Sequence, residues 1–242
     1  MLLDRPLFSV VIPVWQEADK IRAALDHLHC VAEGIPYEVI VVDGDREEST
    51  LKAIRPFLGA MDRFPRVPVH CVISEKGRGN QMNYGAEKAI APILLFLHVD
   101  TKLPPQALEK ILSKLNQSRE IAAGAFDLSI ESSRWIFKMI GKVSSWRSRI
   151  TRIPYGDQGI FIRREVFEAV GGFENVPLME DVTLMRSLKK QHIKICFLSD
   201  PVCTSARRWE REGIIRCTLR NWCLITLYLL GVKPQFLSQF YR

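Results

Sequence analysis

Carboxylates at or just beyond the ends of apolar runs are the first residues in this sequence that could perform chemistry. Glu17, Asp43 and Asp100 occupy such positions, and His98 lies two residues before Asp100. A carboxylate with a second ligand two residues away suits a divalent cation that bridges two phosphates, because hard cations prefer oxygen ligands and can take the remaining ones from phosphate or water. The alternative is that Asp100 only caps the helix that follows it.

A glycine-rich stretch is the second candidate. Gly77 and Gly79 flank Arg78 and follow Lys76, so the backbone could approach a phosphate with cationic side chains in reach. The stretch lacks the third glycine of the dinucleotide fingerprint and the Gly-Lys-Ser/Thr of a Walker loop. The alternative is a solvated turn before a helix.

The third candidate is the acidic pair Glu180-Asp181, which opens a predicted helix. Acidic residues in a first turn often only complement the helix dipole. A carboxylate fixed beside an acceptor hydroxyl could instead serve as a general base.

Alternating short strands and helices would position these groups. The predicted strands of the first half are 8–14, 37–43, 69–73 and 93–98, and the predicted helices are 21–28, 49–58, 80–91 and 105–115. This order predicts an α/β fold with a parallel sheet and right-handed crossovers. Ligands of such sheets bind beyond the carboxyl ends of the strands.

The pattern changes after residue 121. The predicted strands are 122–130, 159–163 and 193–197, and the predicted helices are 164–170, 180–191 and 211–230. Without a repeat or a linker, we expect a single domain over residues 1–242.

The order of these motifs resembles the family 2 glycosyltransferases of the GT-A fold, in particular their short, single-domain bacterial members. The matching residues are Ser9 to Pro13 with Glu17, Val41 to Gly44, Lys76 to Arg78 with Gln81, Asn83, Gly85 and Ala86, His98 to Asp100, Gly156 to Gly159, Gly171 to Phe173, and Glu180-Asp181. The resemblance implies a nucleotide-sugar-binding half over about residues 1–115 and an acceptor-binding half over about 116–242.

The resemblance also implies roles for individual residues. The residues expected to bind the donor, a nucleoside diphosphate sugar, are Pro13, Glu17, Asp43, Lys76, Arg78, Gln81, Asn83, His98 and Asp100. Asp100, with His98, would hold Mn²⁺ or Mg²⁺ on the diphosphate. Asp181 would take the proton of the acceptor hydroxyl, with Glu180 beside it, and the residues expected to position the acceptor are Gly156, Asp157, Gln158, Arg208 and Trp209.

The implied reaction is a metal-dependent, inverting sugar transfer, with a uridine diphosphate sugar as the favoured donor and an acceptor that could be lipid-linked. The family usually has Asp-x-Asp where this chain has His98-Val99-Asp100. Some processive members carry Gln-x-x-Arg-Trp, but Ser205 stands at the glutamine position before Arg208-Trp209, which argues against polymer synthesis. The alternatives are a sugar-phosphate nucleotidyltransferase and a catalytically inactive nucleotide-sugar-binding protein.

Basic residues concentrate in one segment. Residues 134–152 hold six cationic and no acidic side chains, in a chain with a formal charge of +7, and bulky apolar residues alternate with the cations. This pattern and the apolar segment 211–230 predict peripheral contact with an anionic membrane. The alternative is that both segments pack on the domain and expose only their charges. No nucleic-acid-binding motif is present, so we expect no nucleic-acid partner.

Six scattered cysteines without a C-x-x-C pair predict reduced, mostly buried thiols and a cytoplasmic protein, peripheral on the inner face of the plasma membrane. The N-terminal apolar run contains Asp4 and Arg5, so we expect a strand there and not a signal peptide. The apolar run from Trp222 to Val232 is too short to span a bilayer.

Overall fold

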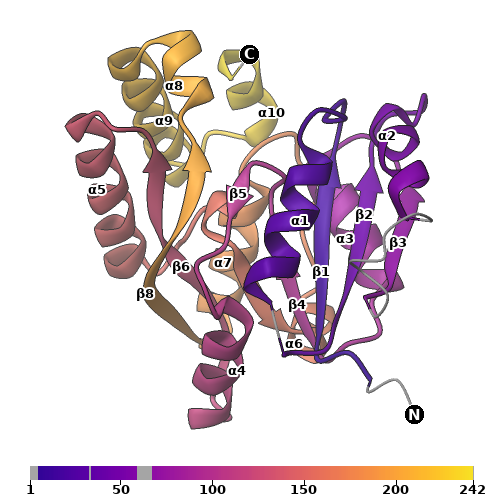
Figure 1. Ribbon diagram of the computed structural model, residues 1–242. Helices are drawn as coiled ribbons and strands as arrows, with labels where there is room; N and C mark the ends of the chain where they lie inside the picture. The colour runs from indigo at the N-terminus through magenta and orange to yellow at the C-terminus, as the bar shows by residue number, and fades with distance from the viewer. Residues whose placement is uncertain (1–4, 33, 59–66, 242) are drawn as a thin grey trace.

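A mixed sheet of eight strands, in the order β3-β2-β1-β4-β7-β6-β8-β5, carries helices on both faces (Figure 1). The computed structural model describes residues 5–32, 34–58 and 67–241. The start of the N-terminal run, Met1 to Asp4, for which a strand was predicted, lies outside the described residues.

The first half is the predicted parallel sheet. Its elements are β1 (Phe8–Val14), α1 (Ile21–Val31), β2 (Tyr37–Asp43), α2 (Ser49–Leu58), β3 (Val69–Ile73), α3 (Arg78–Lys88) and β4 (Ile93–Phe96). β1 pairs in parallel with both β2 and β4, and β2 with β3. Every residue of β1 and β2 is buried, which explains their continuous apolar runs.

The second half adds strands of both directions. Its elements are β5 (Thr101–Lys102), α4 (Ala107–Gln117), β6 (Ile121–Glu131), α5 (Trp135–Thr151), η1 (Gly156–Gln158), β7 (Ile160–Arg163), α6 (Arg164–Ala169), α7 (Glu180–Lys190), β8 (Lys194–Ser205), α8 (Arg207–Glu212), α9 (Ile214–Leu229), α10 (Pro234–Leu237) and η2 (Ser238–Phe240). β7 runs antiparallel between β4 and β6, whereas β6 and β8 are parallel.

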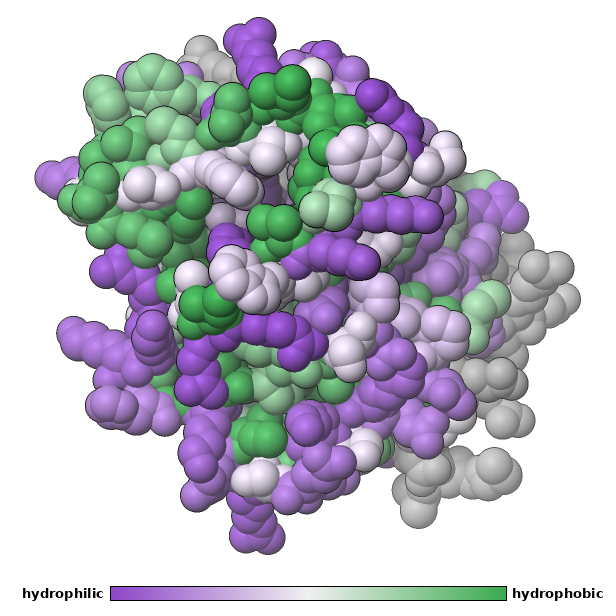
Figure 2. All heavy atoms as spheres, turned by 90° about the vertical axis from the view of Figure 1, so that its left-hand side faces the viewer, coloured by the Kyte–Doolittle hydropathy of each residue, from purple (hydrophilic) through white to green (hydrophobic). Residues whose placement is uncertain are grey.

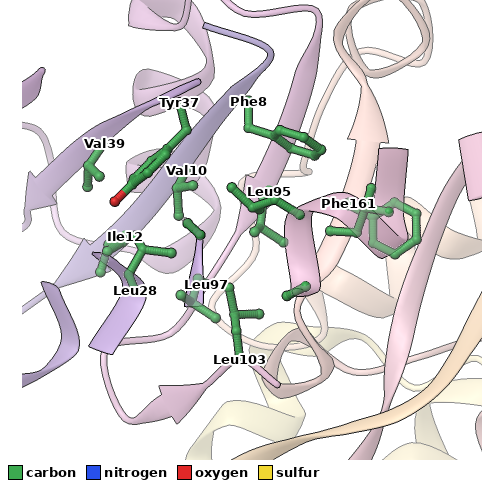
Figure 3. Packing of buried hydrophobic residues seen from close by; sticks show 14 of the residues in the cluster. Phe8, Val10, Ile12, Leu28, Tyr37, Val39, Leu95, Leu97, Leu103 and Phe161 are labelled. Atoms are coloured by element: carbon green, nitrogen blue, oxygen red, sulfur yellow. The ribbon is translucent and has the colours of Figure 1, made fainter. Parts of the chain in front are cut away.

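Apolar side chains fill both faces of the sheet. Phe8, Val10 and Ile12 of β1 point to the face that α1, α2 and α4 cover, together with Leu95 and Phe161 (Figure 3). The alternate residue Val11 points to the other face, which α3, α6, α7 and α9 cover. This alternation is the period of two expected of a strand buried on both sides.

Several expectations are wrong in detail. The helix predicted over 211–230 is two helices, because Gly213 between α8 and α9 adopts φ 89°, a left-handed value outside the helical range. The helix predicted from Asn80 already begins at Arg78, after Gly77 with φ 138°. Of the six cysteines, which are all free, only Cys196 and Cys217 are buried.

Candidate functional site

A cavity of about 440 Å³ opens where β1 and β4 end, next to the start of α7. The predicted site residues that line it are Pro13, Glu17, Arg78, Gln81, His98, Asp100, Gly156, Asp157, Glu180, Asp181, Arg208 and Trp209. These residues come from both halves of the chain. Twelve of the sixteen predicted residues therefore surround one space at the edge of the sheet.

Asp181 is held rigidly at this cavity. The N–H of Gly156 donates to its Oδ2 at 2.6 Å, and the N–H of Val182 donates to its Oδ1 at 2.7 Å. A Cβ on Gly156 would lie 3.0 Å from Nε2 of His98 and 3.5 Å from the same Oδ2. Glycine at position 156 therefore lets η1, β4 and α7 approach closely enough to bring His98 and Asp181 together.

A second close approach joins α3 to the loop that precedes α7. A Cβ on Gly79 would come within 2.7 Å of the carbonyl oxygen of Glu174, so only glycine fits there without movement. This contact brings Nη1 of Arg78 to 3.5 Å from Oε1 of Glu180. Burial raises the pKa of the Glu180 carboxyl, and the positive charge of Arg78 opposes that rise. Arg78 thus stands at the cavity wall with a buried counter-ion behind it.

Asp157 is the least well satisfied acid of the site. Its Oδ1 is buried and accepts no hydrogen bond from the described residues. Burial, together with the negative charges of Asp181 and Asp100, raises the pKa of Asp157 to about 6, against the opposing charge of Arg147. Three carboxylates, Asp100, Asp157 and Asp181, are therefore close enough to influence one another across the cavity.

The donor groups present fit a divalent cation shared with phosphate. Burial and the nearby Arg78 lower the pKa of His98 to about 4, against the pull of Asp100, so its imidazole is neutral near pH 7. Neutral imidazole and carboxylate both bind Mn²⁺. The described residues contain no group of three or more His, Cys, Asp or Glu side chains arranged to hold a metal alone. A cation held by Asp100 and His98 would need phosphate or water oxygens to complete its shell.

The C-terminal helices α8 and α9 and the chain after α10 contribute to the cavity wall. The guanidinium of Arg208 lies 3.8 Å from the ring centroid of Tyr241, and both residues line the cavity. Glu212 accepts from Nε of Arg208 at 3.2 Å, which orients the guanidinium. Nη2 of Arg207 lies 3.8 Å from Oε1 of Glu17, a contact between α8 and the loop after β1.

Four predicted residues do not line the cavity. Asp43 is fully buried and accepts from the N–H groups of Asp45 and Leu51, so it shapes the loop after β2. Asn83 exchanges two hydrogen bonds with the backbone of Phe173. The buried Gln158 accepts from Ser148 and donates to the carbonyl of Phe126. Lys76 lies 3.6 Å above the ring of Trp15. For the first three, the geometry indicates a structural role.

Several residues that were not predicted from the sequence also line the cavity, among them Trp15, Tyr155, Asn221 and Tyr241. Trp15 and Tyr155 are adjacent to motifs already identified, and each bears a cation on its ring, Lys76 and Arg147 respectively. An aromatic residue beside a strand-end motif was an available signal. Asn221 and Tyr241 offered none, because they reach the cavity only through the packing of α9 and of the chain after α10.

A mixed sheet whose strand-end acids meet at one cavity is the arrangement expected of a GT-A glycosyltransferase. Residues 9–172 match the family model described as glycosyl transferase family 2, and the chain belongs to this family. It is 23% identical over 175 residues to a dolichol-phosphate mannosyltransferase of Pyrococcus furiosus, covering 67% of this chain and 47% of that protein. It is 26% identical over 179 residues to the glycosyltransferase AglE of Haloferax volcanii, covering 70% and 57%. The chain thus spans about half the length of the curated relatives it matches.

Solved structures share the fold. The mannosyltransferase PcManGT from Pyrobaculum calidifontis, in complex with GDP-Man and Mn²⁺, superposes with a TM-score of 0.60 at 20% identity, covering 83% of this chain and 56% of that one. S. aureus TarS 1–349 in complex with UDP-GlcNAc gives 0.60 at 16% identity, covering 82% and 58%. The predicted α/β GT-A fold and the predicted glycosyltransferase class are confirmed.

Proposed function

We propose that this chain transfers a sugar from a nucleoside diphosphate sugar to a hydroxyl acceptor with inversion at the anomeric carbon. The observation that carries the proposal is the convergence of Asp100 and Asp181, 81 positions apart in the sequence, on one cavity that also exposes Arg78 and Arg208. One carboxylate faces the expected diphosphate, and the other is fixed beside the expected acceptor.

The first half is the proposed donor half. Pro13, Glu17 and Gln81 line the cavity beside the ends of β1 and β2, where the nucleoside would lie. Arg78 and Arg208 would neutralise the diphosphate as it leaves. A bound divalent cation, held by Asp100 and His98, would stabilise the charge that develops on the leaving diphosphate. Mn²⁺ in the PcManGT complex supports this choice of metal.

The second half is the proposed acceptor half. Asp181 would accept the proton of the attacking hydroxyl, because backbone N–H groups fix both of its oxygens in place. Its neighbour Glu180 would hold Arg78 in position. Gly156, Asp157 and Trp209 would contact the acceptor from η1 and α8.

The donor is tested by incubating the protein with a panel of nucleoside diphosphate sugars, uridine and guanosine forms included because the two structural neighbours carry one of each. Release of nucleoside diphosphate, dependent on Mn²⁺ or Mg²⁺ and on an added hydroxyl acceptor, supports the proposal. Release of pyrophosphate from a sugar phosphate and a nucleoside triphosphate would assign a nucleotidyltransferase. Donor binding without turnover by any acceptor would indicate a binding protein.

A further inference from the structure

We infer that the surface formed by the outward sides of α5 and α9 docks onto an anionic phospholipid bilayer. This surface is called the α5–α9 face below. Figure 1 places α5, α8 and α9 on one side of the molecule, and Figure 2, which looks onto that side, shows apolar side chains gathered over its upper part. Beneath the surface the helices touch, since Phe137 of α5 packs against Trp209 of α8 with ring centroids 6.2 Å apart.

The outward side of α9 carries large apolar residues, as its inward side does. Cys217, Leu224, Ile225 and Tyr228 are buried against the domain. The exposed apolar residues recur at helical spacing on the other side, with Ile215 75% exposed, and comprise Ile215, Leu219, Trp222 and Leu229, followed by Leu230. A helix with large apolar side chains on two sides is normally covered on both of them. The domain covers only one of these sides of α9.

The outward side of α5 mixes apolar and cationic residues. Its large exposed apolar side chains are Trp135, Met139, Trp146 and Ile150, with Trp135 72% exposed. Lys138 and Lys142 are exposed between these apolar residues. Neither lysine forms an ion pair within the described chain, and three more exposed cations are equally unpaired there: Arg134, Arg216 and Lys233. Tryptophan and unpaired lysine beside aliphatic residues are typical of helices that lie in the headgroup region.

The charge distribution selects a lipid over other occupants. Segments 132–156 and 213–241 together contain nine Lys and Arg residues and no acidic residue, which leaves 25 basic against 27 acidic residues elsewhere. Two of these cations, Arg149 and Arg220, are paired with Asp127 and Glu212. The chain is therefore slightly acidic outside the helices that build this face and their flanks. A second copy docked about a two-fold axis would bring like charges together, which is unfavourable. An anionic bilayer accepts both the cations and the apolar side chains.

The inward sides of α8 and α9 line the cavity. Asn221 and Leu224 of α9 and Trp209 of α8 belong to its wall. Because a helix with its side chains is about 10 Å across, a bilayer on the α5–α9 face would lie about one helix diameter from the cavity. A hydroxyl acceptor anchored in lipid would then be close to Asp181. This consequence rests on the proposed function, whereas the docking of the face onto a bilayer does not depend on it.

Co-sedimentation of the full chain with vesicles tests the inference without any activity assay. We expect binding to vesicles of phosphatidylcholine with 30% phosphatidylglycerol at low salt, and little binding to phosphatidylcholine alone or at high salt. Lys138→Gln with Lys142→Gln should lower the partition coefficient about fivefold per cation removed. The double variant Leu219→Ser with Trp222→Ser should lower the partition coefficient further. If this double variant fails to fold, the single variant Ile215→Ser replaces it.

Matched control variants change the same residue types on other surfaces. Lys52→Gln with Lys88→Gln, and Ile90→Ser at an isoleucine that is 65% exposed, should bind like the parent protein. A parent protein that stays in the supernatant with anionic vesicles overturns the inference, and so do control variants that lose as much binding as the face variants. A dimer in analytical ultracentrifugation that Ile215→Ser dissociates would assign the face to a second copy instead. None of these outcomes affects the proposed sugar transfer.

Discussion

Asp181 receives hydrogen bonds from two backbone N–H groups, one from η1 and one from its own helix. A carboxylate oriented in this way needs no rearrangement before it accepts a proton. Asp181→Asn keeps the size of the side chain but removes the base, so we expect kcat to fall by about 10²–10⁴. The KM for the sugar nucleotide should change little. Rates of nucleoside diphosphate release over a range of donor concentrations provide the measurement.

Asp26→Asn is the control for this substitution, because Asp26 is a half-exposed acid of α1 that does not line the cavity. Its kinetics should match those of the parent protein. An Asp181→Asn protein that turns over at the parent rate would remove Asp181 from the reaction.

Asp157 gives a prediction on pH and stability. Its pKa of about 6 in the folded protein exceeds the ordinary value of 3.8, so the folded state binds this proton more tightly than the unfolded state does. Ionisation of Asp157 therefore destabilises the fold, and the loss sets in above about pH 4 and is complete once the pH has risen through 6. Asp157→Asn should raise the free energy of unfolding at pH 7 by about 1–3 kcal/mol.

Thermal unfolding of both proteins between pH 4 and pH 8 measures this effect. The advantage of Asp157→Asn should shrink toward zero as the pH falls to 4. A variant that is less stable than the parent protein at pH 7 would show that ionised Asp157 contributes favourable contacts.

At the scale of elements, the contact between α3 and the loop that precedes α7 depends on one glycine. Any side chain at position 79 meets the carbonyl of Glu174 in this loop, so Gly79→Ala must push α3 and the loop with the start of α7 apart. We expect a loss of about 1–3 kcal/mol in the free energy of unfolding. Because Arg78 and Glu180 also separate, the KM for the sugar nucleotide should rise. Urea unfolding and donor titration measure the two effects.

Glu87→Ala is the matched control, an exposed position of the same helix. It should leave both quantities near their parent values. Equal behaviour of the two variants would mean that α3 and α7 adjust without cost.

The sequence predicted those elements whose burial leaves a simple pattern. β1 and β2 are buried along their whole length, so their apolar runs identified them. β8 was predicted only over 193–197, whereas it continues to Ser205, because its later residues alternate between buried and exposed positions and include Pro201. The break at Gly213 was not predicted, because a glycine inside a helical pattern can either continue the helix or end it in a left-handed conformation. The sequence alone does not decide between the two.

The sequence could identify polar residues at strand ends but not which way they point. Asp100 and Asp43 both end apolar runs, yet only Asp100 lines the cavity. Asp43 instead accepts from the N–H of Asp45 in the loop after β2 and from the N–H of Leu51 in α2. Gln158 matched a site motif and is instead buried between α5 and β6. The direction in which such a side chain points depends on hydrogen-bond partners that are distant in the sequence.

At the scale of the whole molecule, the cavity lies where the two halves of the chain meet. β1, α3 and the segment after β4 line one side, and η1, α7, α8 and α9 line the other. The Arg207–Glu17 ion pair joins these sides. A ligand that fills this cavity must therefore couple the two halves, and its effect should appear in global unfolding.

Among the described residues, no helix combines the length and the hydropathy that a membrane span requires.

Adding donor and Mn²⁺ together should raise the melting temperature of the full chain. A ligand at one hundred times its Kd stabilises the folded state by about 2.7 kcal/mol, and about 2–4 °C is expected per kcal/mol for a chain of this size. The shift should require both components, because Asp100 and His98 provide too few ligands to hold the cation without the diphosphate. EDTA or Asp100→Ala should abolish most of it, whereas Asp26→Asn should preserve it. A full shift with sugar nucleotide in EDTA would show that Arg78 and Arg208 suffice for the diphosphate and that the cation has no part in donor binding.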